Sequence, residues 1–196
     1  MKNQFLLALT VCCIAIVFSA CNGKEKKPEG KSFISAQSFI NSQLKDIDTS
    51  LYAIIKVNYR DSITRDTEYI RREDIRIVAK DFLDIADLSS ERFTEENIPG
   101  PTEGLTTVSY KPINPAKEEV QRMDFIINPD LAQEGKNVVK TIYIERGISN
   151  KDSSVQKKML WQVDNSFQVT TTRQLPGQPE INSTFRVSWN GDEDNP

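Results

Sequence analysis

Three acidic residues, Asp81, Asp84 and Asp87, recur at every third position and are the clearest candidates for cation chemistry. Carboxylate oxygens are the ligands that Ca²⁺ prefers, and several of them must surround one ion. At this spacing on a helix, successive carboxylates rotate slowly around the axis and face water. The pattern therefore indicates a solvated helix face and not a metal site.

Serine and lysine residues that could supply a nucleophile and its base stand close together further along the chain. Ser153 and Ser154 precede Lys157 and Lys158. A Ser–Lys pair can catalyse acyl transfer, but only when the two side chains meet in a fixed geometry. Proximity in a loop does not provide that geometry, so we predict no catalytic pair here.

Aromatic residues form the third group, because they are enriched in ligand clefts. Trp161 and Trp189 are in phase with the apolar residues of their predicted strands, which favours packing in the core. Tyr143 falls on the opposite face of its strand, together with Thr141 and Glu145. Tyr143 is therefore the better candidate for a surface contact.

The composition excludes several common kinds of active site. The chain has no histidine and 3 cysteines, of which Cys12 and Cys13 lie in an apolar run near its start. Without histidine there can be no Ser-His-Asp triad and no histidine-ligated zinc or iron centre. The 8 glycines are never spaced as in a phosphate-binding loop. We predict no enzymatic activity, no catalytic residue, no metal site and no cofactor.

The charge balance argues against nucleic acid as a partner. Lys and Arg number 25 against 28 Asp and Glu, which gives a net charge of −3. No run of basic residues is long enough to neutralise a phosphate backbone. We therefore expect no nucleic-acid binding.

The apolar run Phe5–Phe18 carries no charge and follows Lys2. As a helix it would reach about 21 Å, whereas the hydrocarbon core of a bilayer is about 30 Å thick. The run is too short to span a membrane, but it suits the apolar region of an export signal. The segment FSAC that ends at Cys21 resembles the lipobox of bacterial lipoproteins, in which an aliphatic and two small residues precede cysteine.

This resemblance implies cleavage before Cys21, so that residues 1–20 are a signal peptide. It also implies a thioether-linked diacylglycerol on Cys21 and usually a third acyl chain on the new amino group. Two or more acyl chains hold a protein stably in a membrane, which makes membrane lipid a partner. The mature chain would then retain one cysteine, and that one acylated, so no internal disulfide can form. The alternative is an ordinary signal peptide cut near Ala20, with Cys21 a free thiol.

The residues after Cys21 bear on location. In lipoproteins of this kind, Asp directly after the cysteine favours the inner membrane, and this chain has Asn22. The outer membrane is therefore expected in a bacterium with two membranes. Surface-export signals of Bacteroidota lipoproteins carry acidic residues close to the cysteine, and NGKEKK is a poor match. We expect the periplasmic face.

The rest of the chain divides into three parts. Residues 21–32 contain Pro28, two glycines and no large apolar residue, which is typical of a flexible tether. Residues 33–190 are expected to form a single domain. The acidic segment GDEDNP, residues 191–196, is expected to be a frayed tail.

Helical spacing occurs twice in this domain. The apolar residues from Phe33 to Ile47 recur at steps of three and four, with Ser32 or Ser35 as the N-cap. The segment REDIRIVAKDFLDIA, residues 72–86, has the same spacing and predicts a second helix.

Between the two helices, alternation in LYAIIKVNY, residues 51–59, predicts a strand. It is followed by a hairpin tip at RDSITRDT and a short partner strand, TEYI. Asp61-Ser62-Ile63 in that tip resembles the short O-glycosylation motif of exported Bacteroidota proteins. Ser62 is therefore a candidate glycosylation site, since a hairpin tip has room for a glycan.

After a stiff loop at Ile98–Gly104, the pattern is that of strands. Six are expected: LTTVSY, VQRMDFII, VVKTIYIE, KKMLWQV, SFQVTTTRQ and STFRVSW. Apolar and polar residues alternate in most of them, which is typical of an antiparallel sheet covered on one face. We predict a two-layer α+β fold, with N-terminal helices packed on one face of an antiparallel β-meander.

Taken together, these features indicate a lipid-anchored cell-envelope lipoprotein that serves as a non-enzymatic binding or assembly module. An envelope protein is the expected partner, because anchoring near one membrane raises local concentration. A carrier of a lipid or other apolar ligand is an alternative and would need a large apolar cavity. A carboxylate-dependent envelope hydrolase is a second alternative, which would need two acids about 5–9.5 Å apart across a cleft.

Overall fold

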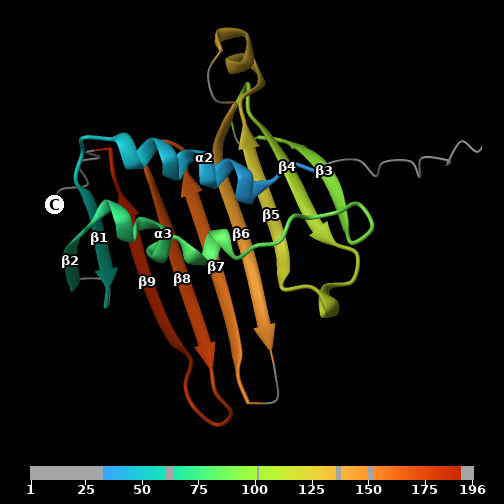
Figure 1. Ribbon diagram of the computed structural model, residues 1–196. Coiled ribbons are helices and arrows are strands. Elements are labelled where there is room, and N and C mark those ends of the chain that lie inside the picture. The colour runs from blue at the N-terminus through green and yellow to red at the C-terminus, as the bar shows by residue number, and fades with distance from the viewer. Residues whose placement is uncertain (1–32, 61–63, 101, 136–137, 150–151, 191–196) are drawn as a thin grey trace, which may run out of the picture. The chain divides into compact units, whose positions relative to one another are not determined.

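The first predicted helix is present in the computed structural model, which describes residues 33–60, 64–100, 102–135, 138–149 and 152–190. Helix α2 comprises Ala36–Thr49 (Figure 1). Ser35 caps it, because its hydroxyl accepts a 3.1 Å hydrogen bond from the backbone N–H of Ser38. Ser32, the other expected cap, lies outside the described residues. The buried residues of α2 are Ala36, Ile40, Gln43, Leu44 and Ile47.

The second predicted helix, residues 72–86, is broken into short pieces. These are the 3-10 turn η1 (Arg72–Asp74) and the helices α3 (Ile75–Val78) and α4 (Lys80–Leu83). At Ala79, between α3 and α4, ψ is 5°, far from the helical value of about −42°. The apolar spacing still identifies the buried face, which consists of Ile75, Ala79, Phe82 and Ile85.

Nine strands form one sheet among the described residues. They are β1 (Ile54–Tyr59), β2 (Arg65–Ile70), β3 (Phe93–Pro99), β4 (Thr106–Pro112), β5 (Val120–Ile127), β6 (Val139–Ser149), β7 (Ser154–Gln162), β8 (Ser166–Gln174) and β9 (Ile181–Ser188). Two further 3-10 turns, η2 (Pro115–Lys117) and η3 (Pro129–Glu134), precede β5 and β6.

Each of the six strands expected after residue 104 corresponds to one of β4–β9, with shifted ends. Two expectations need correction. The first strand begins at Ile54 and not at Leu51. The predicted loop Ile98–Gly104 overlaps the end of β3, a strand that carries glutamates, an asparagine and a terminal proline.

The strand order is β2-β1-β9-β8-β7-β6-β5-β4-β3, and every neighbouring pair is antiparallel. Strands β4 to β9 form the expected meander, and β3, which was not expected, extends it through β4. The expected hairpin is also present, because β1 pairs with β2. This hairpin adds to the end of the sheet through β9, where Val57 is opposite Arg186.

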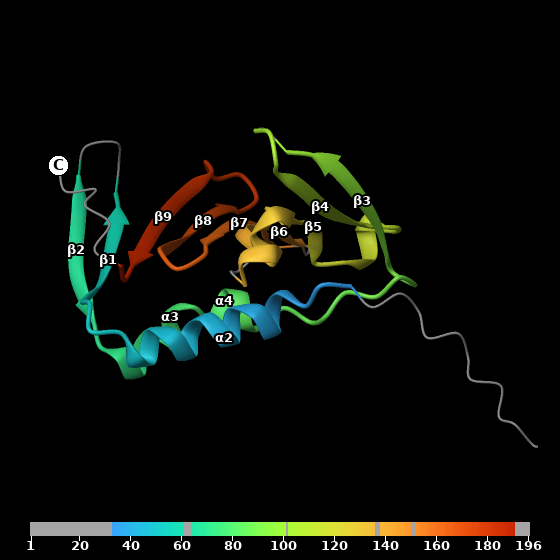
Figure 2. The same cartoon turned by 90° about the horizontal axis from the view of Figure 1, so that it is seen from above.

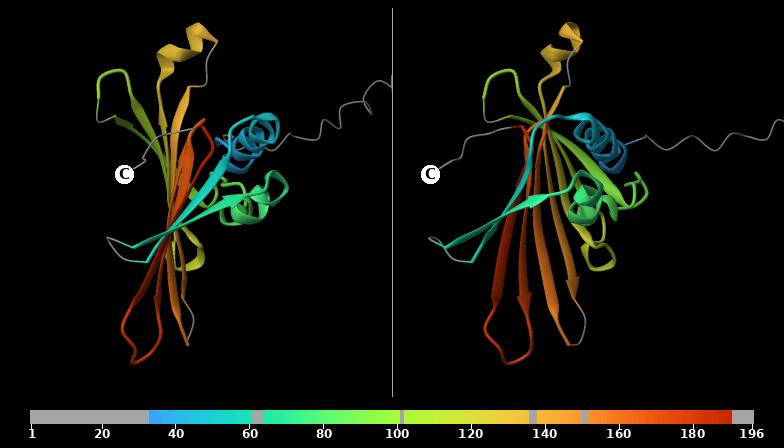
Figure 3. Two further views of the ribbon diagram at one scale, coloured as in Figure 1. Left: turned by 90° about the vertical axis from the view of Figure 1, so that its left-hand side faces the viewer. Right: turned by 60° about the vertical axis from the view of Figure 1, so that its left-hand side comes forward.

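Alternate side chains of each strand belong to the inner face of the sheet, which carries the core. On this face, the ring of Phe82 lies 5.2 Å from Trp161 of β7 and 5.4 Å from Phe167 of β8, measured between centroids. Figures 2 and 3 show α2, α3 and α4 on one side of the strands. Trp161 and Trp189 are buried, as their phase predicts.

The prediction of an α+β fold with an antiparallel sheet is therefore confirmed. All described residues belong to one compact unit, Lys31–Pro196. Within them, no helix is long and apolar enough to cross a membrane.

Candidate binding face of the sheet

The face of the sheet opposite the core, called here the open face, carries rows of side chains that cross all nine strands. Directly paired residues share a face, so the register defines each row. The central row runs, from β2 to β3, through Thr67, Val57, Arg186, Gln168, Leu160, Tyr143, Asp124, Ser109 and Glu96. The chain neighbours of these residues in β5, β7 and β8 are buried in the core, which confirms the assignment of the face.

A second row of the open face contains no charged residue. It consists of Tyr69, Ile55, Ser188, Ser166, Gln162, Thr141, Ile126, Thr107 and Ile98. No described helix lies over these rows (Figure 3). This second row therefore presents hydroxyl, amide, aliphatic and tyrosine side chains.

A buried carboxylate lies in the central row. Asp124 is 6% exposed and accepts a 2.7 Å hydrogen bond from the hydroxyl of Ser109 on β4. Arg122, two residues away on the same strand and face, donates from Nε at 3.0 Å and from Nη2 at 2.7 Å. These bonds compensate the loss of water around the carboxylate, which would otherwise be costly.

Tyr143 lies opposite Asp124 in the register, and Glu145 is two residues further along β6. Burial, followed by the nearby Glu145 carboxylate, raises the pKa of Tyr143 to about 12. The phenol is therefore neutral over the physiological range and can donate a hydrogen bond. Tyr143 is half-buried and is part of the open face, as its phase predicts.

Other polar side chains of the open face bond to one another across strands. The Ser166 hydroxyl donates to Gln162 at 2.8 Å and accepts from Arg186 at 3.3 Å. The hydroxyls of Thr170 and Thr184 are 3.0 Å apart. These bonds fix the side chains before any partner arrives, which lowers the entropy lost on binding.

Ser109 does not have the geometry of a nucleophile. Ser109 is fully buried, and its hydroxyl donates to a carboxylate that also binds a guanidinium. A nucleophile must be reachable by its substrate and stand beside a base with a free lone pair. The Ser109–Asp124–Arg122 group is therefore a structural network.

The three aspartates of residues 81–87 do not converge. Asp81 binds Lys157 of β7, and Asp87 accepts a hydrogen bond of 2.5 Å from the Ser35 hydroxyl. Asp84 ends α4 and lies 3.9 Å from Lys80. No cluster of three acidic or thiol residues that could hold a metal occurs among the described residues.

Ser154 and the two lysines of β7 are also separated. Because β7 side chains alternate, Ser154 and Lys157 belong to opposite faces of the sheet. Lys157 belongs to the inner face and pairs with Asp81. Lys158 shares the face of Ser154, but in an extended strand four residues span about 13 Å.

Cys21 and Ser62, the predicted lipidation and glycosylation sites, lie outside the described residues. Sequence reasoning missed the network of Ser109, Arg122 and Asp124. The signal that could have found it is the charged Asp124 between the apolar Met123 and Phe125, within an otherwise regular strand.

No protein-family model matches the chain. No curated protein matches it either. A comparison with solved structures also gives no match.

Proposed function

We propose that this protein is a lipid-anchored binding or assembly module of the cell envelope, without enzymatic activity. In this proposal the fold has two layers: the helices brace the inner face of the sheet, and the open face receives a protein partner. The anchor is the acylated Cys21, and the location is the periplasmic face of the outer membrane.

The observation that carries the proposal is the composition of the open face. Tyrosine and arginine are enriched in protein interfaces, and the open face carries Tyr59, Tyr69, Tyr143, Arg122 and Arg186. Leu160 and the aliphatic residues of the second row together supply apolar contact area. A partner that covers this face would bury both kinds of group.

The packing between the helices and the sheet gives less support to the carrier alternative. A carrier holds its ligand in a cavity, and side chains that line a cavity retain accessible surface. Phe82, Ile142, Ile144, Met159 and Trp161, which face one another between helices and sheet, each have 0% exposure. The layers are packed together, so an acyl chain would have to separate them.

Capture of partners from native membranes tests the proposal. The full chain would be purified after cross-linking in its own cells, and captured proteins identified by mass spectrometry. We expect one protein to be enriched by the wild type and lost when Tyr69 and Leu160 are both replaced by glutamate. Ile77→Glu is the matched control, because Ile77 of α3 is 71% exposed and Tyr69 is 78% exposed.

The proposal would be wrong if Ile77→Glu abolished capture while the double variant of the open face retained it. Lipid extracted in a fixed ratio with the pure protein would instead support the carrier. Cleavage of an envelope glycan by the pure protein would support the hydrolase.

A further inference from the structure

A short edge of strand β6 remains unpaired where β5 ends. The last pair between β5 and β6 joins Val120 to Arg146, whereas β6 continues with β7 as far as Ser149. The backbone N–H of Gly147 donates to the backbone carbonyl of Glu119 at 2.8 Å, on the β5 side. Alternate residues of a strand direct their N–H and C=O groups to the same side. The backbone N–H and C=O of Ser149 therefore point to the same side as those of Gly147, beyond the end of β5.

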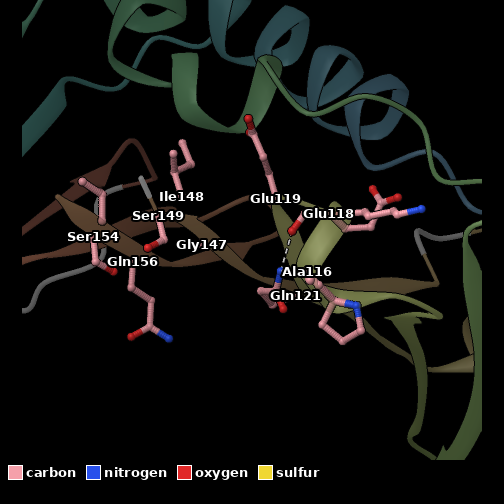
Figure 4. A pocket seen from close by; sticks show the side chains of 12 residues that line it. Ala116, Glu118, Glu119, Gln121, Gly147, Ile148, Ser149, Ser154 and Gln156 are labelled. Atoms are coloured by element: carbon pink, nitrogen blue, oxygen red, sulfur yellow. Dashed lines mark hydrogen bonds between the residues drawn. The ribbon is translucent and has the colours of Figure 1, made fainter. Parts of the chain in front are cut away.

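A pocket of about 660 Å³ lies at this edge, between the β6–β7 hairpin and η2 (Figure 4). Its volume is within the range of about 300–1,000 Å³ that is typical of ligand sites. Gly147 lines it without a side chain, and Ile148 and Val155 supply apolar surface. The hydroxyl of Ser154 and the amide of Gln156 are at the hairpin side of the pocket.

The charges around the pocket leave one cation available. Glu118 binds Arg92, which lowers the pKa of Glu118 by hydrogen bonding. Glu119 binds Arg146 at 2.7 Å. Both acids are therefore neutralised by arginine. Lys117 also lines the pocket, and it is in none of the ion pairs among the described residues.

We propose that this pocket binds the C-terminal end of an extended peptide. The peptide backbone pairs with the free N–H and C=O of Ser149, as in β-strand addition. Its terminal carboxylate binds the ammonium group of Lys117, and a small apolar side chain contacts Ile148 and Val155.

The lining favours a peptide over a sugar. Sugar-binding sites use aromatic rings as stacking platforms, and no aromatic residue lines this pocket. A free strand edge, in contrast, is specific for another backbone in extended conformation. Ser154 and Gln156 belong to the same face of the sheet as the open face. The inference rests on the free edge of β6, however, and does not depend on the proposed function above.

A peptide library with free C-terminal carboxylates tests the inference. The full chain in detergent micelles would be mixed with immobilised N-acetyl tetrapeptides, and the best sequences remade with free and amidated ends. We expect dissociation constants between about 10 µM and 1 mM, with amidation weakening binding about tenfold. Lys117→Ala should weaken binding of the free-acid peptide by the same factor as amidation does. It should leave binding of the amidated peptide unchanged.

Blocking variants separate the pocket from the rest of the surface. Gly147→Val should abolish binding, whereas Gly147→Ala should fold normally, since its Cβ would meet Gln121 Cγ at 3.6 Å, an ordinary contact. Ser154→Trp is a second blocking variant at an exposed position. Unfolding midpoints equal to the wild type would show that both blocking variants are folded.

Three results would overturn the inference. In the first, the wild type retains no peptide more strongly than the blocking variants do. In the second, the free-acid and amidated peptides bind equally well. In the third, a neutral oligosaccharide binds at this pocket and displaces the peptide.

Discussion

The hydroxyl of Ser109 donates a 2.7 Å hydrogen bond to the carboxylate of Asp124, on a face of the sheet that no described helix covers. Both residues are nonetheless buried. Polar side chains of the open face can thus be buried without a helix above them. A buried carboxylate of this kind depends on its partners, because removal of one leaves the others unsatisfied.

Replacement of Asp124 by alanine should therefore destabilise the protein by about 2 kcal/mol, since Ser109 and Arg122 both lose their acceptor. Ser109→Ala should cost less, about 1 kcal/mol, because Arg122 continues to bind the carboxylate. Urea-induced unfolding would measure both changes, with Asp84→Ala as an exposed control. A loss below about 0.5 kcal/mol for Asp124→Ala would contradict the network, because that is the range of unremarkable surface changes.

The broken helical segment should contribute to stability through one side chain in particular. Phe82 has 0% exposure and contacts Trp161 and Phe167 edge-on. Truncation of a buried phenylalanine to alanine costs about 3–5 kcal/mol, because it removes apolar contact and leaves a cavity. We expect Phe82→Ala to lose this amount in chemical denaturation.

Ile77→Ala, in the neighbouring helix α3, is the control for Phe82→Ala. It should change the free energy of unfolding by no more than about 0.5 kcal/mol, because its side chain is exposed. Equal losses for the two variants would mean that α4 does not pack on the sheet as described.

The extent to which the sequence predicts the fold depends on how much of each element is buried. Helix α2 and strands β5 and β8 follow from apolar periodicity, because one face of each lies in the core. Strand β3 was missed because it pairs only with β4 and buries Phe93 alone among its residues. An edge strand needs few apolar residues, so its periodicity is weak.

Two further features depend on contacts between distant residues. The break at Ala79 leaves the apolar spacing intact, so spacing alone cannot distinguish one helix from two short ones. Strand β1 pairs with β9, so that Val57 lies opposite Arg186. The two strands are far apart in the sequence, and no turn between them signals the pairing. The open face and the pocket at β6 both follow from strand register, which a single sequence does not specify.

The pH dependence of stability should carry a contribution from Tyr143. Its pKa is raised to about 12 in the folded state, by burial first and then by Glu145, against about 10 in an unfolded chain. The folded state therefore binds more protons between these values. The contribution is fully present below about pH 10 and is lost as the pH rises toward about 12.

Comparison of the wild type with Tyr143→Phe isolates this contribution from the deprotonation of lysines. The difference in unfolding free energy between the two proteins should shrink between about pH 10 and 12, by on the order of 1–2 kcal/mol. Because the chain has 5 tyrosines, the difference between the phenolate titrations of the wild type and Tyr143→Phe would report the pKa of Tyr143. A difference that is independent of pH would contradict the raised value.

The lipid anchor is the last prediction and concerns residues before the described part of the chain. Cleavage before Cys21 and acylation should give an intact mass that lacks residues 1–20 and includes two or three acyl chains. The wild type should partition into detergent, because two or more buried chains hold a protein stably in an apolar phase. Cys21→Ser should remain in the aqueous phase.

The matched control is Ser19→Ala, which keeps a small residue before the cysteine and should be lipidated normally. If the signal peptide is an ordinary one, the chain will be unlipidated and its Cys21 thiol will react with a maleimide. If Cys21→Ser still partitions into detergent, an apolar surface on the folded part is responsible. Either result would remove the anchor from the proposed function. The open face and the β6 pocket would remain, because both lie within the part of the chain that the structure describes.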